Sequence, residues 1–274
     1  MFEQILDNVR QRAPLIHCIT NYITTNDCAN IVLACGASPT MAEAEQEAAD
    51  IASVAGAVDI NIGNLNTMTV RAMHRAIAAA NQAGVPVVLD PVGAGASAYR
   101  MDTLREFFSA YQFAVVRGNV SELLAVGGAA SNTKGVDAGA ADAVTEENLE
   151  ERVAFFKQLS ASLGAVVSVS GAIDIIASPE RAYICRNGHP MMSRVTGTGC
   201  MLSALTAAFC GANHDQILEA AAAATAVMGV AGDIARKKTE EMGGGTGTFR
   251  VCLMDAVSLM DAQTLQGGMN IEIR

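Results

Sequence analysis

The chain has 274 residues, a length typical of one large domain or two small ones, and 51% of them are hydrophobic, which is ample for a core. Its formal net charge of −10 argues against a nucleic-acid-binding protein, which carries a basic footprint, and against an anionic membrane surface. Seven cysteines at irregular spacings, with no Cys-x-x-Cys pair and no apolar leader, predict a soluble, cytoplasmic protein.

In the first half of the chain, apolar runs of strand length alternate with segments of helical periodicity. Strands are expected over 15–19, 58–62, 85–89 and 113–116, and helices over 2–12, 24–33, 46–54, 68–83, 104–110 and 120–126. The stretch 36–41 contains Gly, Ser and Pro and is expected to be a loop.

The second half begins with a Gly/Ala-rich segment, 127–143, that has no clear period. Strands are expected over 165–169, 173–177 and 182–185, and helices over 146–163, from Cys200 onward, over 216–235 and over 248–263. Such alternation predicts an α/β fold with a mostly parallel central sheet and helices on both faces. No change of composition marks a linker, so residues 1–274 are expected to form a single domain. The longest uncharged stretch, 195–213, has an apolar part too short to span a membrane.

Polar residues follow several of the expected strands. Asn21 comes after the first, Asp90 after 85–89, Arg117 and Asn119 after 113–116, and Ser170 after 165–169. In parallel sheets, ligands bind beyond the carboxyl ends of the strands. These side chains are therefore candidates for one site.

The stretch Thr196-Gly197-Thr198-Gly199-Cys200 is a glycine turn that feeds an apolar helix. The first turn of a helix has N–H groups without intrahelical partners, and with the helix dipole they suit an anion. A tight loop before a buried helix would give the same pattern. The chain contains no P-loop, no Gly-x-Gly-x-x-Gly after the first strand and no Gly-x-Ser-x-Gly elbow, and its four histidines lack metal-ligand spacing.

The candidate residues together suit phosphoryl transfer. Asp90 and Glu122 could hold Mg2+, Arg117 could pair with phosphate oxygens, and the turn 197–200 could stabilise charge on the transferred group. Each has a structural alternative. Asp90 could cap a turn before a proline, Glu122 could form a capping box with Asn119, and Arg117 could be a surface charge.

Several motifs give the sequence a resemblance to a known family. Asn119-Val-Ser-Glu122 is similar to the Asn-x-x-Glu motif of ribokinase-like kinases, and Thr196–Cys200 to their Gly-x-Gly-Asp motif, with Cys in place of Asp. With this Cys variant, the chain resembles the hydroxyethylthiazole kinase family over essentially its whole length. The further stretches that carry the resemblance are Pro14-Leu-Ile-His-Cys-Ile-Thr-Asn21, Gly36-Ala-Ser-Pro-Thr-Met41, Leu89-Asp-Pro-Val-Gly93 and Val116-Arg-Gly-Asn119.

The resemblance implies a ribokinase-like fold and ATP-dependent phosphorylation of the hydroxyl of 4-methyl-5-(2-hydroxyethyl)thiazole in thiamine biosynthesis or salvage. The site residues it implies are Met41, Gly197 and Asn21 for the thiazole, Arg117, Ser170 and Asn119 for ATP, Asp90 and Glu122 for Mg2+, and Gly197, Thr198, Gly199 and Cys200 for catalysis. Ser170 is often Thr in relatives, which keeps the hydroxyl. The family also implies a homotrimer with active sites at its interfaces and no inserted lid.

Two other functions stay open from the sequence. One is a ribokinase-like kinase of another small vitamin-precursor alcohol, of the hydroxymethylpyrimidine or pyridoxal type, although those relatives normally keep Asp at the position of Cys200. The other is a ligand-binding protein without activity, against which the joint presence of Asp90, Arg117, Asn119 and Glu122 argues.

The role of Cys200 is a separate question. A helix N-terminus lowers the pKa of a thiol, whereas nearby ATP phosphates raise it, so thiolate is expected to be a minority species at neutral pH. A loose phosphoryl-transfer transition state needs little help from a base. We therefore expect Cys200 to position the hydroxyl, and the backbone donors of 197–200 to supply most of the catalysis.

Overall fold

The computed structural model describes residues 1–128 and 143–274. The strands of these residues form one nine-stranded sheet in the order β2-β1-β3-β4-β5-β6-β7-β8-β9. Most of the predicted irregular segment 127–143 lies outside the described residues. All described strands belong to this one sheet, in agreement with the expected α/β fold.

The sheet is parallel over its first six strands, and apart from the partly exposed edge strand 38–40 their mainly apolar sequences suit burial on both faces. These are β1 (Leu15–Ile19), β2 (Ser38–Thr40), β3 (Ala57–Asn61), β4 (Val87–Asp90), β5 (Val115–Asn119) and β6 (Val166–Ser170). The antiparallel strands β7 (Asp174–Ala177), β8 (Ala182–Cys185) and β9 (Ile271–Ile273) extend it at one edge.

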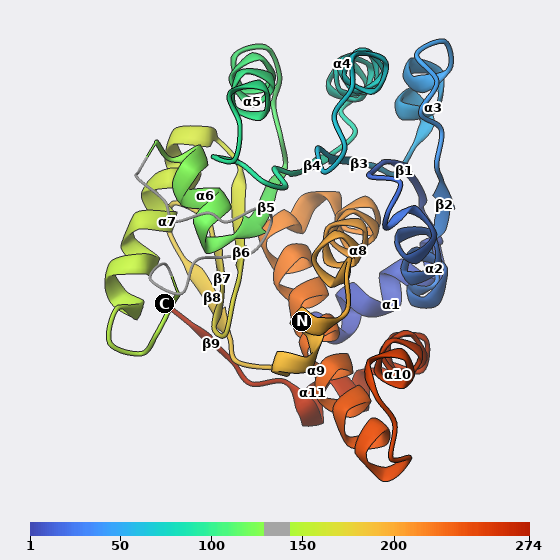
Figure 1. Cartoon of the computed structure of the whole chain (residues 1–274), viewed down its shortest axis with the longest axis vertical. Helices are drawn as coiled ribbons and strands as arrows, with labels where there is room; N and C mark the ends of the chain where they lie inside the picture. Colours follow the sequence, from blue (N-terminus) through green and yellow to red (C-terminus); the bar gives the residue numbers. More distant parts are fainter. Residues whose placement is uncertain (129–142) are drawn as a thin grey trace.

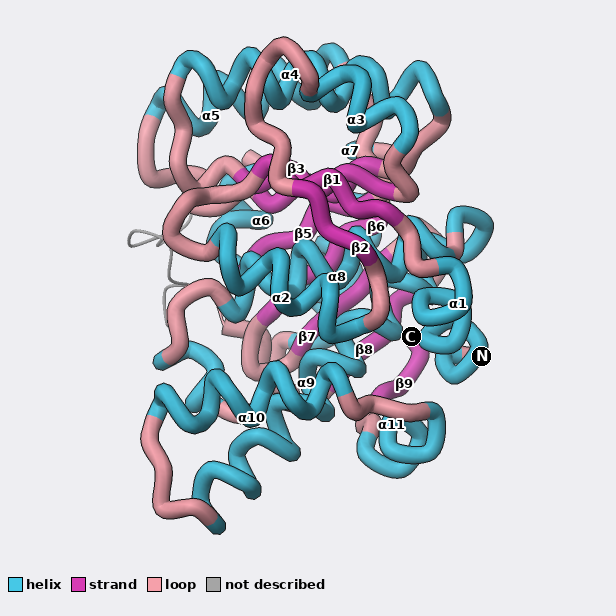
Figure 2. The backbone as a smooth tube through the Cα atoms, turned by 90° about the vertical axis from the view of Figure 1, so that its right-hand side faces the viewer, coloured by secondary structure: helices cyan, strands magenta, loops and turns pink. Residues whose placement is uncertain are grey.

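Helices cover both faces of the sheet, as Figures 1 and 2 show. One layer contains α3 (Ala48–Val54), α4 (Thr67–Ala83), α5 (Ala98–Ala110), α6 (Val120–Val126) and α7 (Leu149–Leu163). The other contains α1 (Phe2–Arg12), α2 (Thr25–Cys35), α8 (Thr198–Ala212), α9 (Ile217–Glu241), α10 (Thr246–Ser258) and α11 (Ala262–Gly268). Each layer has its own buried apolar cluster against the sheet.

The helices α8 and α9 form the centre of the second layer. Small residues let α8 approach the sheet closely: a Cβ on Gly211 would lie 3.1 Å from the carbonyl carbon of Gly56. In the described part of the chain, the segment His214–Glu241 is long and apolar enough to cross a membrane, but 83% of its apolar window is buried inside the protein. Such burial is what the core helix of a soluble protein shows.

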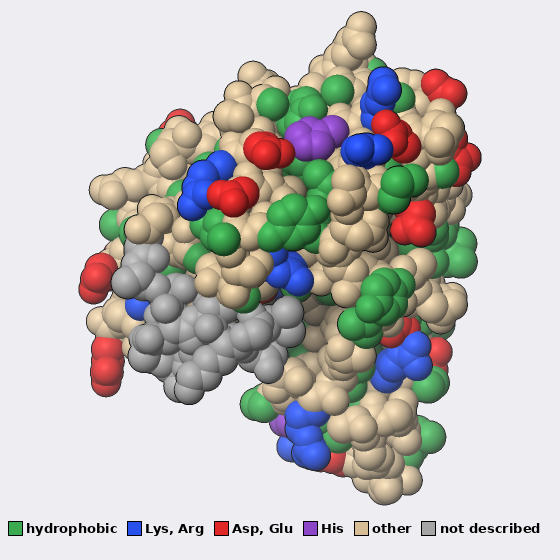
Figure 3. All heavy atoms as spheres, turned by 45° about the horizontal axis from the view of Figure 1, so that its top comes forward, with side chains coloured by type: hydrophobic (Ala, Val, Ile, Leu, Met, Phe, Trp, Pro, Cys, Tyr) green, Lys and Arg blue, Asp and Glu red, His purple; other side chains and the backbone are tan. Residues whose placement is uncertain are grey.

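The outer surface of α3, α4 and α5 carries charges of both signs, which are mixed over the face drawn in Figure 3. Arg75 and Glu45 lie 3.9 Å apart there, and His74 lies 3.7 Å from Glu106. Exposed pairs of this kind contribute little to stability. Such mixed charges are typical of a surface that is in contact with water.

The structure corrects three sequence predictions and contains one strand that was not predicted. The predicted loop 36–41 contains β2, which pairs with β1 at the edge of the sheet. Helix α5 begins at Ala98, six residues before the predicted start, because Ser97 caps it by accepting the N–H of Arg100. The predicted helix 248–263 is two helices, since Asp261 accepts the N–H of Thr264 and starts α11. The strand β9 was not predicted, because a three-residue strand has too little periodicity to detect.

Candidate active site

The carboxyl ends of the parallel strands bring the predicted polar residues together. Asn21 follows β1, Asp90 ends β4, Arg117 lies in β5, and Ser170 ends β6. Asn21, Asp90 and Arg117 are 5% exposed or less. Buried polar side chains need hydrogen-bond partners, and here the partners are other residues of this group and residues of α8.

The N-terminus of α8 faces this edge. Gly197 has a φ of 86°, in the left-handed region, and a Cβ there would lie 2.6 Å from Cγ2 of Thr24. The N-cap residue, Gly197, has no side chain with which to cap the helix, and the first intrahelical bond runs from the N–H of Met201 to the carbonyl of Gly197. The backbone N–H groups of residues 198–200, which come before this first bond, are therefore available to a ligand.

Two cavities meet at this helix end. A cavity of about 490 Å³ is lined by Asn21, Thr24, Asp90, Asn119, Glu122 and the turn 193–200, among others. A second, of about 590 Å³, runs along α8 and α9 past Asp174, Leu202, Thr225 and Met228. Both are lined by Arg117, Ser170, Ser193, Thr198 and Gly199. Two molecules in these cavities would touch each other beside Arg117 and the first turn of α8.

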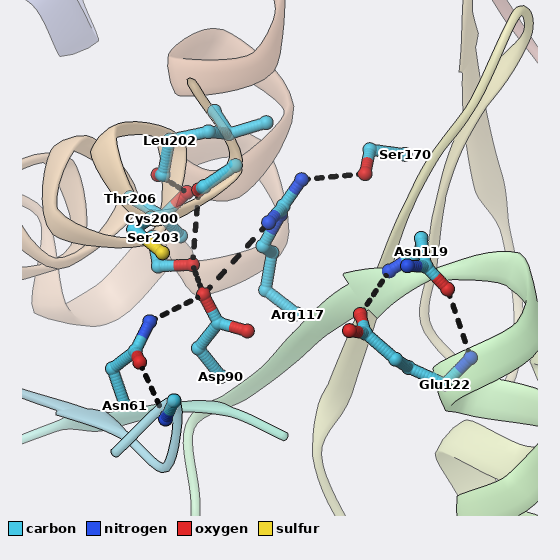
Figure 4. A network of polar contacts seen from close by, with 12 residues as sticks. Asn61, Asp90, Arg117, Asn119, Glu122, Ser170, Cys200, Leu202, Ser203 and Thr206 are labelled. Atoms are coloured by element: carbon cyan, nitrogen blue, oxygen red, sulfur yellow. Dashed lines mark hydrogen bonds and ion pairs between the residues drawn. The ribbon is translucent and has the colours of Figure 1, made fainter. Parts of the chain in front are cut away.

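Asp90 is at the centre of a polar network (Figure 4). Its Oδ2 accepts hydrogen bonds from Ser203 Oγ at 2.6 Å and from Asn61 Nδ2 at 2.9 Å. Arg117 Nη1 lies 3.9 Å from the same oxygen. The other oxygen, Oδ1, is buried and has no partner among the described residues. Burial raises the pKa of Asp90, and Arg117, Ser203 and Asn61 partly offset that rise.

Arg117 is not a surface charge, since it is only 5% exposed. Its guanidinium donates to Ser170 Oγ and lies between Ser170 and Asp90 (Figure 4). Its Nε is buried with no partner in the described part of the chain. A Cβ on Gly199 would lie 2.9 Å from Arg117 Nη1, so glycine is what lets the helix start approach the guanidinium. A fixed cation with donors to spare suits a phosphate.

Glu122 has the capping-box role that its spacing predicts. Its Oε2 accepts the N–H of Asn119 at 2.8 Å, and Asn119 Oδ1 accepts the N–H of Glu122 at 2.9 Å. Its Oε1 accepts the N–H of Gly93 at 2.9 Å. Burial, together with Asp90, raises the pKa of Glu122 to about 7. The carboxyl groups of Glu122 and Asp90 point toward one another across the cavity (Figure 4).

Cys200 lies in the first turn of α8 and lines the smaller cavity. Its Sγ accepts a hydrogen bond from Asn21 Nδ2 at 3.3 Å, and Asn21 Nδ2 also lies 3.1 Å from Asn61 Oδ1. Burial, with the nearby Asp90 charge, raises the pKa of Cys200 to about 11. The thiol is therefore neutral at physiological pH.

The predicted site residues fall into two groups. Ten of them line one or both cavities: Asn21, Asp90, Arg117, Asn119, Glu122, Ser170, Gly197, Thr198, Gly199 and Cys200. Met41 lines neither; it is half-buried and packs against the apolar cluster on the α8 side of the sheet. Its role toward the thiazole stays a prediction.

Three buried residues near the site were missed from the sequence. Asn61 ends β3 as Asp90 ends β4, so the same strand-end rule would have found it. Ser203 lies three residues after Cys200, which places it on nearly the same face of α8. Asp59, two residues before Asn61, is 0% exposed and both its carboxyl oxygens lack partners among the described residues. Burial, with Asp90 nearby, raises the pKa of Asp59.

Comparisons with known proteins show which family and fold the chain belongs to. The hydroxyethylthiazole kinase of Desulfovibrio desulfuricans is 47% identical over 272 residues, which are 97% of this chain and 95% of that protein. The structure of hydroxyethylthiazole kinase protein from Pyrococcus horikoshii superposes with a TM-score of 0.86 at 35% identity and covers 100% of this chain and 98% of that one. A ribokinase-like superfamily protein from Enterococcus faecalis has a TM-score of 0.59 at 12% identity, over 93% of this chain and 90% of that one.

The similarity to the Enterococcus faecalis protein concerns the fold alone, and it identifies this fold as ribokinase-like. A family model described as "Hydroxyethylthiazole kinase family" matches residues 6–263. The range matched by the family model contains the turn 197–200 and the strand ends that line the cavities, and the relatives match over nearly the whole chain. The chain belongs to the hydroxyethylthiazole kinase family.

Proposed function

We propose that this protein transfers the γ-phosphoryl group of ATP to the primary hydroxyl of 4-methyl-5-(2-hydroxyethyl)thiazole, as a kinase of thiamine biosynthesis or salvage. The observation that carries the proposal is the junction of two cavities at the uncapped N-terminus of α8, beside the buried guanidinium of Arg117. One cavity can hold the nucleotide and the other the alcohol, with the transferred group between them.

The larger cavity is the one that we assign to ATP. It combines apolar walls from Leu202 and Met228 with Arg117 and Ser170 at the end shared with the smaller cavity. Arg117 has an unused buried donor, and an anion there would satisfy it. Asn119 uses its side chain and its N–H in the cap of α6, so we expect it to shape the phosphate end of the site.

A divalent cation is implied by the family, and we propose Mg2+. Its donors in this chain would be Asp90, whose Oδ1 has no partner among the residues described, and Glu122, whose oxygens already accept two N–H groups and would act through water. The described residues contain no group of three or more His, Cys, Asp or Glu that could hold a metal alone, so phosphate oxygens of the nucleotide would have to supply further ligands. When bound, the ion neutralises charge on the phosphates.

The smaller cavity is assigned to the thiazole alcohol, with Asn21, Gly197 and Cys200 around its hydroxyl. The alcohol oxygen forms a bond to the γ-phosphorus, the bond to the β,γ-bridging oxygen breaks, and ADP leaves. The alcohol proton goes to solvent, because Cys200 is a neutral thiol. The N–H groups of the turn 197–200 and Arg117 stabilise the charge on the transferred group.

We further propose a cytoplasmic homotrimer with active sites at the subunit interfaces. The seven cysteines are all free, which fits a reducing compartment. Tyr22 and Ile23 are 79% and 61% exposed beside Asn21, and Ile23 lines the smaller cavity. A neighbouring subunit that covered them would exclude water from the site, as a lid does in other enzymes.

The test is an ATP-consumption assay with the thiazole alcohol at fixed ATP and Mg2+. We expect turnover that depends on the alcohol and a product that carries one phosphoryl group. Hydroxymethylpyrimidine and pyridoxal are the comparison substrates. If either one is turned over faster, that compound and not the thiazole alcohol is the acceptor. The absence of turnover with all three would reject the kinase proposal.

A further inference from the structure

Two buried donors bind the same oxygen of Asp90. Ser203 Oγ, on α8, and Asn61 Nδ2, at the end of β3, both donate to Oδ2, at 2.6 and 2.9 Å. Ser203 is 0% exposed and Asn61 is 1% exposed. Neither residue lines either cavity, so neither is placed to touch a substrate.

Within the described part of the chain, the two donors leave Asp90 with Oδ2 bonded and Oδ1 without a partner. The torsion that turns a carboxyl group is soft, so the carboxyl needs partners to hold a single orientation. With Oδ2 held by donors from two elements, the unpartnered Oδ1 faces Glu122 (Figure 4). A cation ligand held in place by its own partners binds more tightly than one that turns freely.

Ser203 Oγ has a second acceptor within reach, the carbonyl oxygen of Gly199 one turn earlier in α8, at 3.4 Å. Many serines in helices make this kind of contact. The contact to Asp90 is shorter by 0.8 Å, and its acceptor is a carboxylate. Hydrogen bonds to charged groups are the stronger kind, so the bond to Asp90 dominates.

We infer that Asn61 and Ser203 are positioning residues that fix the orientation of Asp90, so that its Oδ1 is presented to the metal–nucleotide complex. The inference rests on the proposed function, since it assigns Asp90 to that complex. Asn61 also ties this arrangement to the acceptor side, because its Oδ1 accepts from Asn21, the residue that donates to Cys200.

The experiment measures binding of Mn2+ with ADP by electron paramagnetic resonance, in the absence of any acceptor. Ser203→Ala removes one hydroxyl, and because alanine favours helices the variant is expected to fold. Thr206→Val is the matched control: it removes a buried hydroxyl of α8 that donates to the carbonyl of Leu202. Asn61→Ala is the second test variant. Each change is also made in an Asp90→Asn background.

We expect Ser203→Ala and Asn61→Ala to weaken Mn2+–ADP binding about tenfold or more, as for loss of a bond to a charged group. Thr206→Val should bind like the parent. In the Asp90→Asn background the Ser203→Ala change should have no further effect, since the carboxylate ligand that Ser203 orients is gone.

Unchanged binding in both test variants would overturn the inference and leave the proposed function standing. So would a loss of equal size in the Asp90→Asn background, which a merely structural role would produce. A parent protein that binds no Mn2+–ADP would reject the proposed function, and the inference with it.

Discussion

Cys200 is a neutral thiol in this site, because burial and the adjacent Asp90 charge raise its pKa to about 11. Its Sγ accepts a bond from Asn21 in the cavity assigned to the alcohol. A neutral thiol cannot take the hydroxyl proton at pH 7. That Cys200 positions the substrate stays a prediction; burial, which the sequence argument had not weighed, is the main reason why its thiol is neutral.

Cys200→Ser should therefore keep at least about a tenth of parental turnover, and Cys200→Asp should match or exceed the parent at pH 8. An aspartate starts from a pKa of about 3.9, so the same burial leaves it largely ionised at that pH. Steady-state rates with both substrates varied would check this. A folded Cys200→Asp variant that binds both substrates and is nearly inactive would show that the thiol has another role.

Asp59 is a buried carboxyl with no partner in the described part of the chain, between the apolar residues of β3. Its pKa is raised by burial, so the native state holds a proton that the unfolded state releases near pH 4. From about pH 4 up to the native pKa, the unfolded state binds fewer protons. The free energy of unfolding therefore falls as pH rises through that window, by up to about 1.4 kcal/mol per pH unit.

Asp59→Val should stabilise the protein by about 1–3 kcal/mol near pH 7, because it removes an unsatisfied buried group. The gain should shrink as pH falls toward 4. Denaturant unfolding of both proteins at one concentration, at several pH values, would measure it. Asp59→Asn is the control, since it keeps a buried polar group but cannot ionise. A gain that did not vary with pH would mean that Asp59 does not titrate in this window.

At the scale of the element, the start of α8 depends on Gly197. Its positive φ is unfavourable for any other residue, and an added Cβ would collide with Thr24. Gly197→Ala should shift the turn away from the cavities and lower kcat/KM by about tenfold or more. Gly247→Ala is the control, because Gly247 lies in the first turn of α10 with open space around it. Equal activity of the two variants would show that the conformation of this turn does not contribute to catalysis.

The first turn of α6 depends on Glu122, which closes the capping box and faces Asp90. Glu122→Gln should cost about 1 kcal/mol of stability and raise the Mg2+ concentration needed for half-maximal rate about tenfold. Asp261→Ala removes the cap of α11 and is the control for stability alone. If Glu122→Gln titrates with Mg2+ as the parent does, Glu122 is only a cap.

At the scale of the whole molecule, exposed apolar residues lie at the opening of one cavity. Tyr22 and Ile23 are exposed at a place where a neighbouring subunit would bury them. If the proposed homotrimer forms through this surface, Ile23→Glu should separate it into monomers and raise KM for the alcohol more than KM for ATP. Light scattering would measure the oligomeric state, and steady-state kinetics would measure the two KM values. Val54→Glu is the control, since Val54 is 73% exposed at the opposite end of the sheet. Full activity of a monomeric parent would reject the trimer.

The sequence by itself was sufficient for the order and type of most elements. The helix Phe2–Arg12 and the strand Leu15–Ile19 have the predicted bounds, because local periodicity and the proline at position 14 define them. The capping box of Asn119 and Glu122 is likewise local, and so is the glycine turn before α8. Interactions within a few residues suffice for such features, which is why they could be predicted.

Only the tertiary structure decided what surrounds each side chain. β2 and β9 exist because they pair with strands distant in sequence, Leu15–Ile19 and Ala182–Cys185. Arg117 is buried, and Asn61 and Ser203 meet at Asp90, because β3, β4 and α8 pack together. The same packing partly buries Cys200 and raises its pKa. Burial and electrostatics depend on contacts across the whole chain, and local sequence patterns do not specify them.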